Sequence, residues 1–223
     1  MPAQFTPRLD ILAAPQRRLW AEFGALPAEF VLYGGTALAL RLGHRRSDDF
    51  DFFSRRPLDP LRLMPALPFL AGATVVQREP NTLSCLVDRG GVVKLSFFGL
   101  PDLPRLRPPD VAQGSGVRVA ALIDLAGTKA AVVQMRAEAK DYLDIDAMLT
   151  RGGLDLPTAL AAARALYGPA FAPLATLKAL TFFADGTLPR LPAAVKARLT
   201  AAVRAAAPDR LPDIPPCAEV VGR

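Results

Sequence analysis

Two short segments of this chain carry side chains suited to binding a metal ion and phosphate. Residues 33–36 read YGGT, and residues 47–53 read SDDFDFF. Alternate residues of a strand point to the same side, so Asp49 and Asp51 are expected to share one face, with Asp48 on the opposite face. Two carboxylates in that arrangement can hold a divalent cation. The residue types and their spacing therefore suggest a site for a metal ion and a nucleotide.

The elements around these segments can be predicted from residue type. Residues 30–33 are expected to form a strand, and the two glycines that follow would permit a tight turn close to a ligand, or an ordinary tight turn alone, before a helix begins at Thr36. The start of a helix favours phosphate. In the aspartate strand, Phe50 is expected to face the core and Phe52 the carboxylate side.

A small mixed sheet is predicted to continue after the aspartate segment. Three further strands are expected, at residues 73–77, 82–87 and 92–98. Residues 88–91 read DRGG, a typical hairpin turn. Alternation in the last strand puts Lys94 and Ser96 on one face, which we expect to be the face of the two carboxylates.

The composition predicts a globular protein of the cytoplasm. The chain has 223 residues, 51% of them hydrophobic, and a formal charge of +6. The basic residues are mostly arginine, which suits phosphate or nucleic acid, although a solvated surface explains scattered arginines about equally well. Cys85 and Cys217 have no paired spacing and are expected to be free thiols. The start lacks an apolar signal core, and no apolar run reaches the roughly 20 residues of a membrane span.

Prolines between residues 101 and 109 divide a mixed first half from an alanine-rich second half. Helices are expected at 9–23, at 119–149 with a possible break at Gly127, and then at 157–167, 173–183 and 192–207. The predicted fold class is α+β. It comprises a mixed-sheet domain over residues 1–115, an α-helical domain over 116–210 and a flexible tail over 211–223, with nucleotide expected in the cleft between the domains.

A stripe of charge crosses the first predicted helix of the second half. Lys129, Arg136, Lys140 and Asp144 are spaced by seven, four and four residues, which places them along one side of a helix. Such a stripe can also be a solvated face with pairs such as Lys140 and Asp144. The spacing alone does not decide between a charged stripe with a functional role and a solvated helix face.

Taken together, four segments resemble a known family. Residues 32–38 (LYGGTAL), 44–47 (HRRS), 49–53 (DFDFF) and 140–144 (KDYLD) occur in the order seen in AbiEii/AbiGii-type nucleotidyltransferase toxins, which are similar to the polymerase-β-like nucleotidyltransferases. The likeness covers roughly residues 30–150. It implies a toxin of a toxin–antitoxin system that uses Mg²⁺ or Mn²⁺ to transfer a nucleoside monophosphate from an NTP to an acceptor.

The resemblance also implies partners and site residues. RNA is the expected acceptor, in particular the 3′ end of tRNA, and an antitoxin is an expected partner whose direct contact is left open. Asp49 and Asp51 are the expected metal ligands and, with Lys129 and Asp141, the expected catalytic residues. Asp141 or Asp144 is expected to position either Lys129 or a metal-bound water. Nucleotide binding is expected from Gly34, Gly35, Thr36, Arg45, Arg46, Ser47, Lys94 and Lys140. His44, the single histidine, is expected to make a structural hydrogen bond.

One position departs from the wider polymerase-β-like pattern. That pattern often adds a third carboxylate on a neighbouring strand, where strand alternation here selects Ser96. Three interpretations follow: substrate oxygens complete a two-carboxylate site, Asp141 or Asp144 supplies the third acid, or the site binds nucleotide with little transfer. The last corresponds to an alternative function, a nucleotide- or RNA-binding module. A glycosyltransferase that uses Asp-x-Asp is a less favoured third alternative.

Overall fold

The structure is a computed structural model that describes residues 2–217. The chain divides into two compact units. Unit 1 comprises Met1–Leu103 and Pro109–Ala120, and unit 2 comprises Pro104–Pro108 and Ala121–Arg223. The predicted domain limits at residues 115 and 210 stay predictions, and part of the predicted tail lies outside the described residues.

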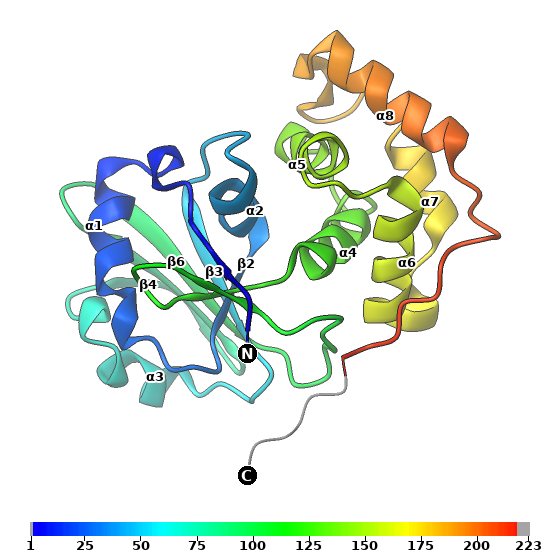
Figure 1. The fold of residues 1–223 in the computed structure, drawn as a ribbon. Helices are drawn as coiled ribbons and strands as arrows, with labels where there is room; N and C mark the ends of the chain where they lie inside the picture. Colours follow the sequence, from blue (N-terminus) through cyan, green and yellow to red (C-terminus); the bar gives the residue numbers. More distant parts are fainter. Residues whose placement is uncertain (1, 218–223) are drawn as a thin grey trace. The chain divides into compact units, whose positions relative to one another are not determined.

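Within the described residues, unit 1 is built on a mixed sheet of eight strands, in the order β1-β7-β8-β2-β3-β6-β5-β4. Figure 1 labels β2, β3, β4 and β6 of this sheet. The central strand β3 runs parallel to β6 and antiparallel to β2. The predicted α+β class is confirmed, and short strands that the sequence did not indicate widen the sheet. The strands are β1 (Gln4–Phe5), β2 (Val31–Tyr33), β3 (Asp49–Ser54), β4 (Thr74–Glu79), β5 (Thr82–Asp88), β6 (Val92–Gly99), β7 (Asp110–Ala112) and β8 (Arg118–Val119).

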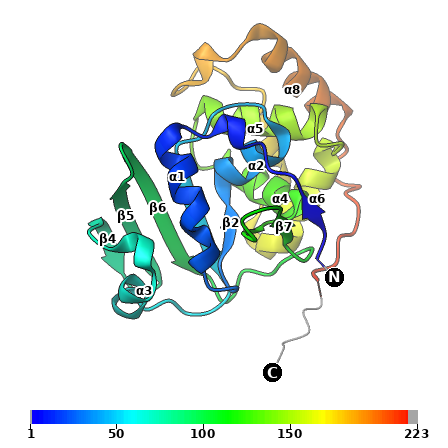
Figure 2. The ribbon, with the colours of Figure 1, turned by 60° about the vertical axis from the view of Figure 1, so that its left-hand side comes forward.

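Three α-helices belong to unit 1: α1 (Ala14–Glu22), α2 (Gly34–Leu42) and α3 (Pro60–Ala66), with 3-10 turns at Leu9–Ile11, Phe23–Ala25 and Pro68–Leu70. Figure 2 shows α1 lying across one face of the sheet. The predicted helix over 9–23 is interrupted, because Pro15 has no backbone N–H to donate and so sits in the first turn of α1.

Aromatic rings fill the core between α1 and the sheet. Trp20 and Phe23 pack against Phe50, at centroid distances of 6.1 and 4.9 Å. Phe52 stacks on Phe97 at 5.4 Å, and both rings are fully buried. The expectation that Phe52 lies on the carboxylate side is wrong, because a strand alternates sides with every residue and Phe52 therefore shares the face of Phe50.

Unit 2 is helical in the part that the structure describes. Its helices are α4 (Leu122–Val132), α5 (Ala139–Thr150), α6 (Leu156–Tyr167), α7 (Pro173–Ala179) and α8 (Ala193–Ala205), with 3-10 turns at Gly168–Ala170 and Leu188–Arg190 (Figure 1). No described helix of either unit has the length and apolar character needed to cross a membrane.

The predicted helix over residues 119–149 breaks at residues 133–138 and not at Gly127. Gly127 lies inside α4, where a Cβ atom would come within 2.9 Å of the Ala162 backbone and 2.8 Å of the Leu166 side chain. The glycine is therefore required by the close approach of α4 to α6, and it does not end the helix.

A buried aspartate attaches the segment Pro104–Pro108 to α4. The Asp124 carboxylate accepts hydrogen bonds from the backbone N–H of Leu106 (2.8 Å) and of Arg107 (3.1 Å). Burial raises the pKa of Asp124 to about 6, although these hydrogen bonds act in the opposite direction. Cys217 N–H donates to the Arg105 carbonyl at 2.7 Å, so the end of the described chain contacts the same segment.

Candidate functional site

The two aspartates of the SDDFDFF segment lie on one face of the sheet. In the parallel pairing of β3 with β6, Asp49 is opposite Lys94 and Asp51 is opposite Ser96. Both aspartates are partly exposed, whereas Asp48, just before the strand, is exposed. We call the group formed by Gly34, Gly35, Arg45, Ser47, Asp49 and Asp51 the carboxylate site.

The two glycines bring the backbone of α2 against this face. Gly34 has φ +73°, and a Cβ atom there would lie 2.7 Å from Asp51 Oδ2. A Cβ atom on Gly35 would overlap the Arg45 guanidinium and lie 3.2 Å from Ser47 Oγ. The helix begins at Gly34, two residues before the predicted start. The positive φ at Gly34 favours glycine there, and the close approach puts the N-terminal end of a helix beside a carboxylate and an arginine.

Thr36 and Ser47 act through the backbone of the aspartate segment. Thr36 is buried, and its hydroxyl donates to the Asp49 carbonyl. The Ser47 carbonyl accepts from Gln16 Nε2 at 2.7 Å. Their contacts hold the segment in place, so the predicted nucleotide contact of the Thr36 side chain stays a prediction. Gln16, buried on α1, was missed because it occupies a position on the apolar stripe of that helix, where only packing was expected.

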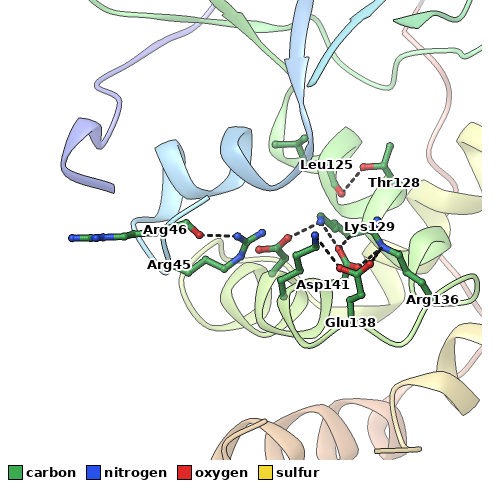
Figure 3. A network of polar contacts seen from close by, with 10 residues as sticks. Arg45, Arg46, Leu125, Thr128, Lys129, Arg136, Glu138 and Asp141 are labelled. Carbon is green, nitrogen blue, oxygen red and sulfur yellow. Dashed lines mark hydrogen bonds and ion pairs between the residues drawn. The ribbon is translucent and has the colours of Figure 1, made fainter. Parts of the chain in front are cut away.

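Arginine side chains lie at both ends of α2, with Arg45 beside the glycine turn. Arg45 donates from Nη1 to the Arg46 carbonyl at 2.8 Å, and the Arg46 side chain is exposed (Figure 3). At the other end of α2, Arg41 forms an ion pair with Asp110 at 2.8 Å and donates to the Ala120 carbonyl at 2.7 Å. Arg41 therefore fixes α2 to the far strands of unit 1, a function that sequence alone did not indicate.

The donor set of the carboxylate site fits one hard divalent cation. Mg²⁺ is usually bound by one or two carboxylates together with substrate phosphate oxygens and water. The described residues contain no cluster of three or more His, Cys, Asp or Glu that could hold a metal ion. At the position of the expected third acid, Ser96 is buried, and its Oγ lies 3.3 Å from Ser84 Oγ. Two carboxylates are thus what this face offers to a metal ion.

A second group of charged residues lies in unit 2. Lys129 Nζ on α4 is 2.6 Å from Asp141 Oδ1 and 2.6 Å from Asp144 Oδ2, both on α5. Arg136, in the segment between the helices, donates from Nε to Asp141 Oδ2 at 2.7 Å and from Nη2 to Oδ1 at 3.1 Å (Figure 3). We call Lys129, Arg136, Asp141 and Asp144 the lysine network.

Lys129, Asp141 and Asp144 of the lysine network are buried, and their charges are matched together with that of the more exposed Arg136. Both aspartates are fully buried, and Lys129 is 5% exposed. Burial on its own would raise the pKa of Asp141, but the hydrogen bond from Arg136 and the charge of Lys129 outweigh it, so the pKa is lowered. Both oxygens of Asp141 already accept charged donors. Asp141 is thus better suited to hold Lys129 than to act as a third metal ligand.

The interpretation of residues 129–144 as a solvated helical stripe is wrong. The helix is broken before Arg136, and Asp144 pairs with Lys129 on the other helix. Lys140, which is exposed, forms its ion pair with Glu138 at 2.9 Å instead. Two buried carboxylates need a cation close by, and a lysine on the adjacent helix supplies it.

Solved structures share this fold. A candidate nucleotidyltransferase from H. pylori aligns with a TM-score of 0.55 and 19% identity, over 85% of this chain and 91% of that one. MenT4, the nucleotidyltransferase toxin Rv2826c from Mycobacterium tuberculosis H37Rv, aligns with a TM-score of 0.59 and 18% identity, over 86% and 84%. The chain therefore has a nucleotidyltransferase fold.

The sequence comparison identifies the family. The model described as nucleotidyl transferase AbiEii toxin, type IV toxin–antitoxin system, matches residues 18–216, so the chain belongs to this family, as the four sequence segments predicted. It is also 35% identical over 130 residues to the uncharacterized protein aq_aa25 of Aquifex aeolicus (strain VF5). That match covers 57% of this chain and 61% of the relative, so the chain spans less than two thirds of that protein's length.

Proposed function

We propose that this protein is a toxin-type nucleotidyltransferase that transfers a nucleoside monophosphate from an NTP to an acceptor hydroxyl with the help of Mg²⁺ or Mn²⁺. The observation that carries the proposal is the contact between the Gly34 backbone and the Asp51 carboxylate, beside Asp49. It combines a helix N-terminus, which favours phosphate, with two carboxylates that suit a divalent cation.

Residues of the carboxylate site bind and orient the NTP in this proposal. Asp49 and Asp51 hold the divalent ion, which when bound neutralises charge on the phosphates. The backbone at Gly34 and Gly35 approaches the phosphate chain, and Arg45 can bind it in a forked arrangement. Exposed Arg46 contacts phosphate or the backbone of the acceptor. Rate enhancement then comes from positioning and electrostatic stabilisation.

Lys129 is assigned a catalytic role in the same proposal, and Lys140 a contact to nucleotide. Asp141 and Asp144 fix the position of the Lys129 ammonium through ion pairs of 2.6 Å each. A lysine with fixed geometry costs less reorganisation when it meets developing negative charge. The lysine network therefore supports a preorganised cation.

RNA is the acceptor that we propose, and the 3′ end of tRNA in particular. The formal charge of +6 and the excess of arginine suit a polyanion such as RNA. Membership of a toxin family also supports an acceptor whose modification would harm the cell. We further propose a cytoplasmic location and an antitoxin partner, in keeping with the two free cysteines and the type of toxin–antitoxin system that the family model names.

One observation favours a second candidate function. Ser96 stands where the wider superfamily often has an acid, and it is buried against Ser84. A site with two carboxylates could bind nucleotide or RNA with little turnover. This candidate predicts nucleotide binding without transfer.

The decisive experiment incubates purified protein with each α-labelled NTP, Mg²⁺ and total tRNA, in parallel with Asp49→Ala. The proposed enzyme yields labelled RNA with one or more NTPs, and the variant yields none above background. Equal labelling by both proteins would refute the catalytic assignment. NTP binding, measured by calorimetry, with no labelled RNA would favour the binding module.

A further inference from the structure

Two rows of side chains cross the face of the sheet that carries Asp49 and Asp51. The pairing of β2, β3, β6 and β5 defines them. The first row contains Asp49, Lys94 and Leu86, and the second contains Tyr33, Asp51, Ser96 and Ser84. The neighbouring strands thus contribute no third acid to either row. The charged side chain that they contribute is the cation of Lys94.

Lys94 lies where its ammonium can contact a ligand bound by Asp49 and Asp51. Neighbouring strands lie about 4.8 Å apart, so the Lys94 backbone is close to that of Asp49, and its side chain is on the same face and long enough to reach a ligand there. Lys94 is exposed, and in the part of the chain that the structure describes neither Lys94 nor Asp49 forms an ion pair. Both charges therefore remain available to a ligand.

A count of formal charges shows that such a lysine can replace one divalent ion together with one carboxylate. Three carboxylates with two divalent ions carry one net positive charge toward the substrate. Two carboxylates with one divalent ion and one ammonium carry the same charge. The face therefore keeps the electrostatic balance of a two-ion site with a single ion, and an ammonium supplies point-charge stabilisation without carboxylate ligands of its own.

We propose that Lys94 takes the place of a second divalent ion, so that the site works with one bound ion and the Lys94 ammonium. This inference rests on the proposed function. In the transfer, the acceptor oxygen bonds to the α-phosphorus, and the bond from that phosphorus to the pyrophosphate oxygen breaks. The electron pair leaves with pyrophosphate, and the hydroxyl proton passes to water. Lys94 binds the α-phosphate oxygens and stabilises the charge that they carry in the transition state.

The number of bound ions gives a test that needs no turnover. Mn²⁺ binding is measured by electron paramagnetic resonance in the presence of α,β-methylene analogues of the four NTPs. One Mn²⁺ per chain is expected for the wild type and for Lys94→Gln. Two Mn²⁺ per chain in the wild type would overturn the proposal for Lys94 and leave the proposed function standing.

Transfer kinetics give the second test. Lys94→Gln is expected to lower the rate of nucleotide transfer about 100-fold, and Lys94→Arg to recover part of the loss. Lys178→Gln, which removes the charge of another exposed lysine on α7, is the matched control and should stay within about twofold of the wild type. A Lys94→Gln rate within the same twofold range overturns the proposal. Absence of transfer by the wild type refutes the proposed function instead.

Discussion

The carboxylate site and the lysine network each contain two aspartates with basic residues nearby, but their charges are used differently. In the carboxylate site the aspartates are partly exposed, and Asp49 forms no ion pair within the described residues. In the lysine network Asp141 and Asp144 are fully buried and share one lysine at 2.6 Å. The first site can take up the charge of a ligand, whereas the second has already balanced its own.

This difference predicts different results when a residue is removed. Partly exposed acids contribute less to folding than buried, ion-paired acids, so their loss should affect catalysis far more than stability. Buried matched charges depend on one another, because removing one leaves an uncompensated charge in the interior. Measuring activity and stability together therefore separates the two regions.

The largest effect is expected at the carboxylate site. Asp51→Ala should lower the transfer rate by about 1000-fold or more, because it removes one of two ligands for the divalent ion. The free energy of unfolding should change by less than about 1 kcal/mol. Both are measured on the same preparation, by labelled-RNA formation and by urea denaturation. Asp48→Ala, an exposed neighbour, is the control and should retain activity; loss of activity in both would contradict the assignment.

In the lysine network the main expected effect is on stability. Lys129→Met leaves Asp141 and Asp144 buried without their shared cation, and should lower the free energy of unfolding by about 3–5 kcal/mol. Denaturant titration measures this loss. Lys140→Met removes an exposed lysine paired only with Glu138, and should cost about 0.5 kcal/mol or less. Equal losses in the two variants would show that burial does not distinguish them.

Gly34→Ala tests the contact between the glycine turn and Asp51. The new Cβ atom would lie 2.7 Å from Asp51 Oδ2 and push the carboxylate aside, so the transfer rate should fall about 10- to 100-fold. Gly72→Ala is a matched control, because Gly72 has φ +74° and no atom within 4 Å of its added Cβ. Both variants place alanine at nearly the same positive φ. Only Gly34→Ala should lose activity beyond what backbone strain explains, as judged from the two transfer rates and melting curves.

The smallest expected effect depends on pH. Arg136 lowers the pKa of Asp141, so its stabilising contribution is present above the ordinary aspartate pKa and is lost as pH falls through the lowered value. Because Arg136 is partly exposed, Arg136→Gln should cost about 1 kcal/mol near neutral pH. The difference from the wild type should shrink below about pH 4. Denaturation at several pH values measures it, with exposed Arg62→Gln as control, and a difference that grows toward acid would contradict the mechanism.

The sequence predicted the parts of the fold that local patterns determine. The period-two alternation of residues 92–98 and the DRGG turn led to the correct strands and to the correct face for Lys94 and Ser96. Strands of two or three residues, such as β1, β7 and β8, carry no such pattern and were missed. Their pairing depends on contacts between residues far apart in the chain, among them the ion pair of Arg41 with Asp110.

The candidate site was predictable in its residues and less so in their environment. Asp49, Asp51 and the glycine pair were found from spacing alone. The burial of Asp141 and Asp144 could not be predicted from the sequence, because closely spaced aspartates on a helix normally indicate solvent exposure. Only the arrival of Lys129 from another helix makes burial favourable, and that is a tertiary contact. The assigned roles of these residues stay predictions.

The glycine inside α4 has a consequence for motion. Because a methyl group at Gly127 would collide with the Ala162 backbone, α4 and α6 lie backbone against backbone, with little freedom to slide. Lys129 is two residues further along α4, so the backbone that carries its side chain is expected to move together with α6. The alanines buried along α6 then reflect a requirement for close contact. Amide hydrogen exchange in α4 and α6 should be slow, and under destabilising conditions it should become faster in both helices together. The two helices would then behave as one rigid body that carries the Lys129 charge.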